Sequence, residues 1–157
     1  MRNSYVSREA KTGRVLFIRL QPGTDLLTGI LEACADNSIR YAVVSTVIGS
    51  LTRARFVYAV PDKEGKLGIR YSQPVEVEGP LEFIGGQGVI GISDREEAMI
   101  HFHGVVSNKD MKVYAGHFVE GGNPVLATIE AVIQELDNIR LVRSYDEETG
   151  FPLFKPY

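Results

Sequence analysis

The sequence predicts an α/β domain of the α+β type, because strand-length apolar runs outnumber the single clear helical pattern. At least five runs combine apolar and β-branched residues and end at glycine, proline or charged residues. Only one segment, 24–37, repeats apolar residues at helical spacing. The chain has 157 residues, 44% hydrophobic and 24% charged, which predicts one domain spanning residues 1–157. A domain of this size buries about two-thirds of the surface that its unfolded chain exposes.

A strand and a helix are predicted first along the chain. The apolar run 14–20 has strand length and ends at a Gln-Pro-Gly turn. We expect Thr24 to be the N-cap of the following helix, Asp25 to favour its positive end, and the helical pattern to reach Asn37. Cys34, the only cysteine, lies on the apolar face of this helix and is interpreted as a small core residue rather than a nucleophile.

Strand signals dominate the middle of the chain. Residues 41–48 are rich in β-branched side chains, and residues 51–58 alternate apolar with basic side chains. This predicts two paired strands joined by a Gly-Ser step. Charged residues and glycines make 61–68 a loop, and a proline interrupts the short strand material at 69–77. A further apolar run, 81–84, leads into a glycine-rich segment.

That glycine-rich segment matches a nucleotide-binding motif in its letters. Residues 86–91 read Gly-Gln-Gly-Val-Ile-Gly, which fits the G-x-G-x-x-G pattern. A dinucleotide fold needs a helix beginning at this motif, with its N-terminus facing the pyrophosphate. Residues 92–97 are too few and too polar to form that helix, so we interpret the glycines as strand irregularity or close packing.

The last part of the chain is ambiguous from its pattern. Apolar residues alternate along 125–136 as in a strand, yet Glu130 and Gln134 are four apart as on a helix, so both structures stay open. From Asp137 onward, a turn-like Asp-Glu-Glu-Thr-Gly segment and two prolines predict that residues 137–157 form a tail lying across the surface.

All three histidines of the chain lie between His101 and His117. A strand at 101–107 places His101 and His103 on one face and Phe102 on the other. The polar residues that follow can turn the chain back, so that His117 closes the site. Three imidazoles without a thiolate suit Zn²⁺ or a similar divalent transition ion and leave one tetrahedral position for water or a ligand. The alternative is that they are surface or hydrogen-bonded histidines, which the third histidine disfavours.

The length of the turn tests this geometry. His117 shares a face with His103 across an antiparallel hairpin only if the loop has an odd number of residues, such as 109–111. A two-residue loop at 109–110 would instead place His117 opposite Phe102, and the site would then need a bulge to form.

Composition limits the partners. The formal net charge is −3, which gives no general attraction to the phosphate backbone of nucleic acids. No apolar run approaches the roughly 20 residues of a membrane span, and no apolar signal core follows the N-terminal residues. We therefore expect a cytoplasmic protein without a membrane segment.

Five segments in order resemble the plants-and-prokaryotes-conserved (PPC) domain family: 19–27, 43–49, 79–84, 101–103 and 116–121. The resemblance covers about residues 14–136. It implies a mainly antiparallel mixed sheet with one or two packed helices, a strand at 125–136, and a homotrimer. It also implies that the prokaryotic three-histidine metal motif is formed here by His101, His103 and His117. Two recurring acidic positions near that motif correspond to Glu82 and Glu120.

Plant members of this family carry basic AT-hook segments that bind DNA, and this sequence departs from them. It has no Arg-Gly-Arg-Pro segment, and isolated cations lie among acids, as expected for a solvated face. These cations are Arg53, Arg55, Arg140 and Arg143. Direct DNA binding is therefore not expected.

Two functions of different class remain. In the first, the metal site binds or transforms a small anionic or carbonyl substrate, with Glu120 or Glu82 as base or as acceptor for an imidazole N–H. Each glutamate alone is more simply a surface carboxylate, and Ser45 is interpreted as a buried strand residue rather than a nucleophile. In the second, a trimer with a structural metal, or none, acts in gene regulation through partners. The sequence assigns no reaction.

Overall fold

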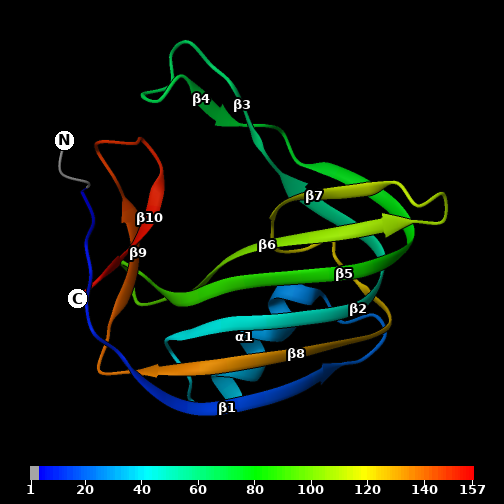
Figure 1. Ribbon diagram of the computed structural model, residues 1–157, viewed down its shortest axis with the longest axis horizontal. Coiled ribbons are helices and arrows are strands. Elements are labelled where there is room, and N and C mark those ends of the chain that lie inside the picture. Colours follow the sequence, from blue (N-terminus) through cyan, green and yellow to red (C-terminus); the bar gives the residue numbers. More distant parts are fainter. Residues whose placement is uncertain (1–3) are drawn as a thin grey trace.

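A computed structural model describes residues 4–157 and shows a large curved sheet with one helix on its face (Figure 1). The elements are β1 (Lys11–Leu20), α1 (Leu26–Asp36), β2 (Ala42–Val57), β3 (Ala59–Pro61), β4 (Ile69–Tyr71), β5 (Val75–Ser93), β6 (Ala98–Asn108), β7 (Val113–Phe118), β8 (Val125–Asp137), β9 (Leu141–Tyr145) and β10 (Pro152–Pro156). Eight strands form one sheet in the order β1-β8-β2-β7-β6-β5-β9-β10, and β3 and β4 form a separate hairpin. All pairings are antiparallel except that of β5 with β9, so the predicted α+β class is confirmed.

Strand β2 explains the curvature of the sheet. One edge of β2 pairs with β5 along most of its length, while the other edge pairs first with β8 and then with the end of β7. Because β7 also pairs with β6, and β6 with β5, these four strands close into a ring of pairings at one end of the sheet. The ring holds β6 and β7, which carry the histidines, against the core.

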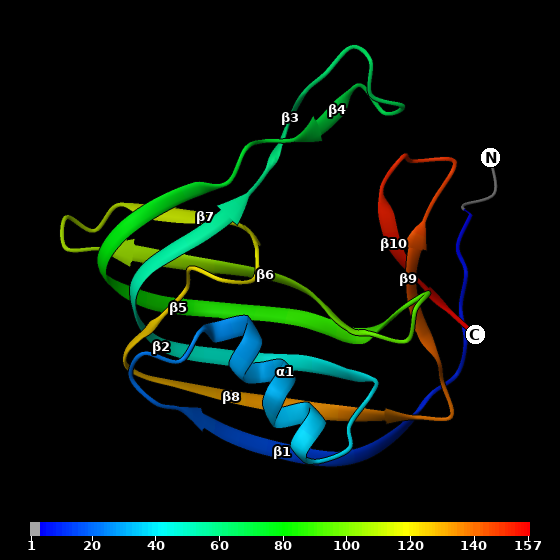
Figure 2. The same ribbon diagram turned by 180° about the vertical axis from the view of Figure 1, so that it is seen from behind.

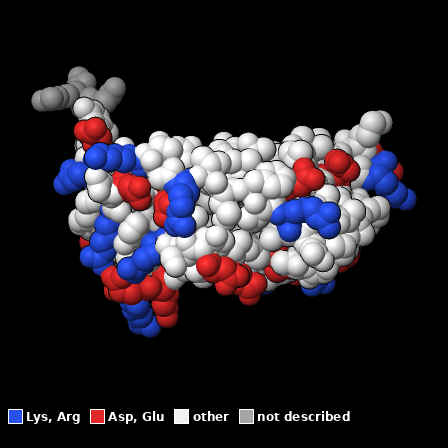
Figure 3. Space-filling view, turned by 90° about the horizontal axis from the view of Figure 1, so that it is seen from below, with Lys and Arg blue, Asp and Glu red and all other residues white. Residues whose placement is uncertain are grey.

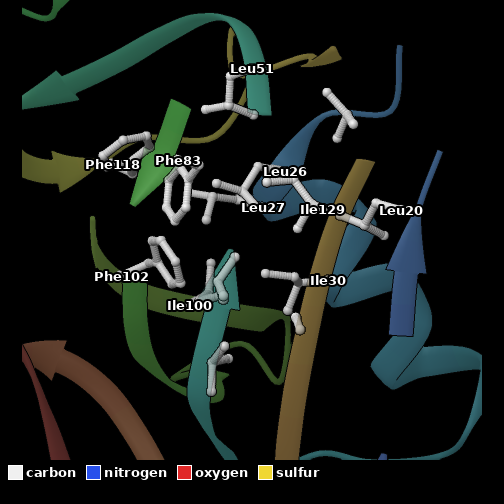
Figure 4. Packing of buried hydrophobic residues seen from close by; sticks show 14 of the residues in the cluster. Leu20, Leu26, Leu27, Ile30, Leu51, Phe83, Ile100, Phe102, Phe118 and Ile129 are labelled. Atoms are coloured by element: carbon white, nitrogen blue, oxygen red, sulfur yellow. The ribbon is translucent and has the colours of Figure 1, made fainter. Parts of the chain in front are cut away.

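The core lies between α1 and the sheet. Figure 2 shows α1 across the face formed by β1, β8 and β2. Three fully buried phenylalanines, Phe83, Phe102 and Phe118, extend this core beneath β6 and β7, and Phe83 lies next to Leu26 and Leu27 of the helix (Figure 4). The rings of Phe83 and Phe118 meet edge to face, with centroids 5.7 Å apart. Cys34 is buried as predicted, and burial raises the pKa of its thiol to about 11.

The N-cap of α1 is Asp25, whereas the sequence predicts Thr24. The Oδ1 atom of Asp25 accepts hydrogen bonds from the backbone N–H groups of Leu27 and Thr28, each at 3.2 Å. Its Oδ2 atom also accepts from the backbone N–H of Asn123 at 2.8 Å. A carboxylate has two oxygens and can accept from the helix N–H groups and from Asn123 at once, whereas a single hydroxyl cannot. The contact with Asn123 therefore selects Asp25 as the cap. The helix ends at Asp36 with Asn37 as its C-cap, in agreement with the sequence.

The expected pair of strands at 41–48 and 51–58 is wrong, because both belong to the continuous strand β2. Gly49, expected to help turn the chain, has a φ of 144° and lies where β8 approaches most closely. A Cβ atom at this position would be 2.1 Å from the carbonyl oxygen of Thr128. The glycine is therefore required for close strand packing and not for a turn.

The glycine-rich motif at 86–91 lies within the single strand β5, and no helix begins there. Cβ atoms added at Gly86 and Gly88 would clash with the ring of Phe102 and the carbonyl oxygen of His101, respectively. This confirms close packing as the reason for the glycines. The ambiguous segment 125–136 is also a strand, β8, whose residues Ile129, Ala131 and Ile133 face the core.

The tail after Asp137 is more ordered than the sequence indicated. Instead of only crossing the surface, it adds β9 and β10 to the sheet, and β9 pairs with the end of β5 through Val142 and Arg143. The strands are only five residues long, so their alternation was too short to recognise. The loop of the β3–β4 hairpin, predicted at 61–68, contacts this tail through an ion pair of Lys66 with Glu147.

Residues 4–157 leave the sheet face opposite α1 uncovered. Its exposed apolar side chains include Val15, Phe17, Ile48, Ile84 and Val113. Seen from below Figure 1, on the side of the edge strand β1, the surface has a broad uncharged area, and Lys and Arg groups lie beside Asp and Glu (Figure 3). Across residues 4–157, no helix has the length and apolar character that crossing a membrane requires.

Candidate metal centre

The β6–β7 hairpin positions the three histidines. His103 pairs with His117 and Ser107 pairs with Val113, so the connecting loop is residues 109–111. Asn108 closes this loop, because its side-chain Oδ1 accepts from the backbone N–H groups of Asp110 and Lys112. The three-residue loop is the odd length that the sequence required for a shared face, and the predicted register is confirmed.

The three imidazoles converge on one point. Their candidate ligand nitrogens all lie within 4.8 Å of one another. The Nε2 atoms of His101 and His103 are 3.1 Å apart, and the three ring centroids are separated by 4.9 to 5.2 Å. A tetrahedral zinc ion with Zn–N distances of about 2.0–2.1 Å separates its ligand nitrogens by roughly 3.3 Å. The donor set therefore fits a single small ion.

The surroundings favour neutral imidazoles. His117 is 8% exposed, His101 is partly buried and His103 is exposed. Burial, together with His101, His103 and Arg143, lowers the pKa of His117 to about 4. Burial, Arg143 and His103 also lower the pKa of His101. Since a metal binds only the unprotonated nitrogen, both shifts leave lone pairs available near neutral pH.

Tyr71, at the end of β4, is a neighbour of the site that the sequence reasoning missed. Its hydroxyl lies 3.5 Å from Nδ1 of His117, and the two rings are 5.2 Å apart. Phe151 of the tail packs edge-on against Tyr71 at 5.3 Å. Only the tertiary fold brings the hairpin and the tail to the histidines, and no local pattern in the sequence marks either residue.

Arg143 is partly buried, whereas the sequence predicts that it lies on a solvated face. Its Nη1 donates to the carbonyl oxygen of Ile100, the residue before His101, at 3.2 Å. Its Nε donates to the carbonyl oxygen of Pro152, and the guanidinium lies 5.8 Å from the ring centroid of Phe154. The positive charge of Arg143 contributes to the lowered pKa values of His101 and His117.

The two glutamates differ in position. Glu120 follows β7 and interacts electrostatically with Arg143, while desolvation and the charge of Asp25 raise its pKa. Glu82 lies on β5 opposite Ser107, whereas Gln87 is the β5 residue opposite His103. Ser107 is four residues from His103, which corresponds to about 13 Å along a strand. Within one chain, Glu82 is therefore not brought to the histidine cluster.

Ser45 is exposed rather than buried, contrary to expectation. Its hydroxyl donates to the carbonyl oxygen of Val132 at 3.3 Å. Together with Ile48, Ile84, Gln87 and His103 it lines an open groove of about 510 Å³ on the uncovered face of the sheet. The groove reaches the exposed side of the histidine cluster and is mostly apolar.

The fold and the site define a small α+β domain with a three-histidine candidate metal centre. Residues 7–137 match the Plants and Prokaryotes Conserved (PCC) domain, and the chain belongs to this family, also abbreviated PPC. The predicted family is thus confirmed.

Solved structures of relatives agree with this fold. A metal-containing protein from Archaeoglobus fulgidus is 27% identical, with a TM-score of 0.81 over 96% of this chain and 99% of that one. A PPC protein from Pyrococcus horikoshii is 26% identical, with a TM-score of 0.80 over 96% and 97% of the two chains. A Bacteroides thetaiotaomicron protein, 17% identical with a TM-score of 0.75 over 93% and 96%, shares the fold. No curated protein sequence matches the chain.

Proposed function

We propose that this chain is a trimeric, cytoplasmic metal-binding protein of the PPC family whose ion has one position open to a small ligand. His101, His103 and His117 would hold a divalent transition ion, with zinc favoured by the all-imidazole donor set. The observation that carries the proposal is the convergence of three imidazole nitrogens within 4.8 Å. The metal-containing relative from Archaeoglobus fulgidus supports it.

The surrounding residues have distinct proposed roles. Tyr71 lies beside Nδ1 of His117, so Nε2 of that ring is left for the ion. The Nε2 atoms of His101 and His103 also face each other, so all three rings would bind through Nε2. Glu120 would accept a proton or a hydrogen bond near the site. When bound, the ion would supply Lewis acidity to the ligand. We assign no reaction, and we give Glu82 no role at the histidines of its own chain.

The trimer is proposed from the uncovered face of the sheet. Apolar side chains such as Phe17 and Ile84 are more than half exposed there, and neighbouring subunits would remove them from water. The open groove beside His103 lies on the same face. Neighbouring protomers would therefore lie close to each metal centre.

The metal assignment is tested by elemental analysis of protein purified without added metal, followed by equilibrium dialysis with Zn²⁺. We expect one ion per chain in the wild type. His103→Ala should abolish tight binding without unfolding the chain, because His103 is exposed. If a variant with all three histidines changed to alanine still holds one tightly bound ion per chain, the assignment is wrong.

The alternative is a DNA-associated or regulatory interaction module. Two solved structures with the same fold, from Bacteroides thetaiotaomicron and Ralstonia eutropha, are provisionally named DNA-binding proteins, at 17% and 21% identity. Against direct DNA binding, the net charge is −3, and Arg55 and Arg140 are paired with Glu76 and Glu96. Salt-dependent, sub-micromolar binding to an AT-rich duplex that survives loss of the histidines would favour this alternative.

A further inference from the structure

We propose that Arg143 makes the open position of the metal centre selective for oxyanions, so that its ligand is a small carboxylate or phosphate rather than a neutral carbonyl compound. This inference rests on the proposed metal site and assigns a ligand class to it. Arg143 would bind one oxygen of the ligand while a second oxygen meets the ion. The argument depends on the placement, the unpaired charge and the free donor of the guanidinium group.

The placement of Arg143 is fixed by neutral partners. Its Nη1 and Nε atoms donate to the carbonyl oxygens of Ile100 and Pro152, and its guanidinium lies against the ring of Phe154. These contacts hold the group beside the β6 residue that precedes His101. Carbonyl dipoles and an aromatic face orient a guanidinium without neutralising it.

The charge of Arg143 is unpaired among the residues that the structure describes. No carboxylate oxygen from residues 4–157 lies within 4.0 Å of its nitrogens, whereas Arg140, three residues earlier, forms an ion pair with Glu96. The Nη2 atom of Arg143 makes no hydrogen bond within the same residues. A guanidinium with a free N–H pair is suited to a carboxylate or phosphate oxygen.

The electrostatics of the site have a net positive sign once an ion is present. The three ligands are neutral imidazoles, and the guanidinium of Arg143 donates to the carbonyl oxygen of Ile100, the residue before His101. Glu120 is the acid identified near Arg143, and it forms no ion pair with it in the described chain. The charges of a divalent ion and a guanidinium exceed that of Glu120 and leave positive charge that an anionic ligand would offset.

A purely structural role for Arg143 is the competing explanation, because its backbone contacts also attach the tail to the sheet. The two roles predict different results for charged and neutral ligands. Loss of an anion-binding residue weakens carboxylate and phosphate binding selectively. Loss of a structural contact disturbs the ion and all of its ligands alike.

The experiment uses the full chain loaded with Co²⁺, whose visible absorption reports on coordination. In chloride-free buffer, acetate, inorganic phosphate and neutral imidazole are titrated separately against the wild type, Arg143→Met and Arg143→Lys. Arg140→Met is the matched control, since it removes a tail arginine that is already paired. Cobalt content per chain is measured for every variant. The acetate and phosphate titrations distinguish the two oxyanions.

We expect Arg143→Met to weaken acetate or phosphate binding at least about tenfold, as for loss of a charge-assisted hydrogen bond. Imidazole binding should change by less than about twofold, and Arg143→Lys should retain part of the anion affinity. If Arg143→Met does not fold, the lysine variant carries the test, because it should still weaken anions more than imidazole. Equal weakening of all ligands, or unchanged anion binding, overturns the inference while the metal site stands. A wild-type chain that takes up no cobalt overturns both proposals.

Discussion

His103 and His117 lie directly opposite each other on β6 and β7, and this pairing determines whether the three imidazoles share a face. In an antiparallel pair, side chains of opposed residues point to the same side of the sheet. Because His101 is two residues from His103, it joins them on that side. The pairing depends on the loop at 109–111, which links a local feature of the chain to the site.

Shortening β7 by one residue should destroy the site. Deleting Ala115 leaves the loop and its flanking pair unchanged but moves His117 from opposite His103 to opposite Gly104, which turns its imidazole to the other face. We expect the affinity for Zn²⁺ to fall at least a hundredfold, measured by competition with a chromophoric chelator. Ala115→Ser keeps the strand length and should bind as the wild type does. Unchanged affinity in the deletion variant would contradict the proposed ligand set.

The metal-free protein should become less stable as the pH falls. An unfolded histidine has a pKa of about 6.5, while that of folded His117 is about 4. Between these values the unfolded chain binds more protons, so stability is present above about pH 6.5 and is lost as the pH falls towards 4. The urea midpoint of metal-free protein should therefore be lower at pH 5 than at pH 7. His117→Asn should reduce this difference, and an equal difference in both proteins would contradict the prediction.

Zinc binding should weaken as the pH falls from about 6.5 towards 4, since protons compete for the imidazole nitrogens.

Tyr71→Phe should weaken zinc binding at constant pH, because the phenol hydroxyl lies beside Nδ1 of His117 and helps to orient the ring. Loss of such a partner typically costs about 10- to 100-fold in metal affinity. Tyr58→Phe removes a hydroxyl from another exposed tyrosine and serves as the control. If the two variants bind zinc equally well, Tyr71 has no part in the site.

Light scattering should give about three times the mass of one chain down to low micromolar concentration. The expected cause is burial of the apolar face opposite α1, where Phe17 is 64% exposed. Phe17→Glu places a charge on that face and should shift the protein towards monomers. Met111→Glu, at an exposed position in the hairpin loop, is the control for added charge. A monodisperse wild-type monomer would remove the trimer from the proposal.

The sequence by itself determined the features that depend on local period and chain length. Alternation at His101 and His103, the odd loop before His117 and the lack of a helix after the 86–91 glycines were all confirmed. Each follows from geometry within a few residues, because strand side chains alternate and a hairpin loop sets its own register. The same local argument identified the helix and the core position of Cys34.

Only the tertiary structure decided the features that depend on contacts between distant segments. The local sequence favours a turn at Gly49, whereas in the structure β8 passes close against this residue. Asp25 is the cap because its carboxylate also accepts from the backbone N–H of Asn123. Tyr71 and Arg143 reach the histidines from the β3–β4 hairpin and the tail, more than twenty residues away in sequence. The period of the sequence indicates which face of a strand or helix a residue occupies. Pairing between distant segments decides which of these faces meet, and the polar residues around the metal centre depend on such pairing.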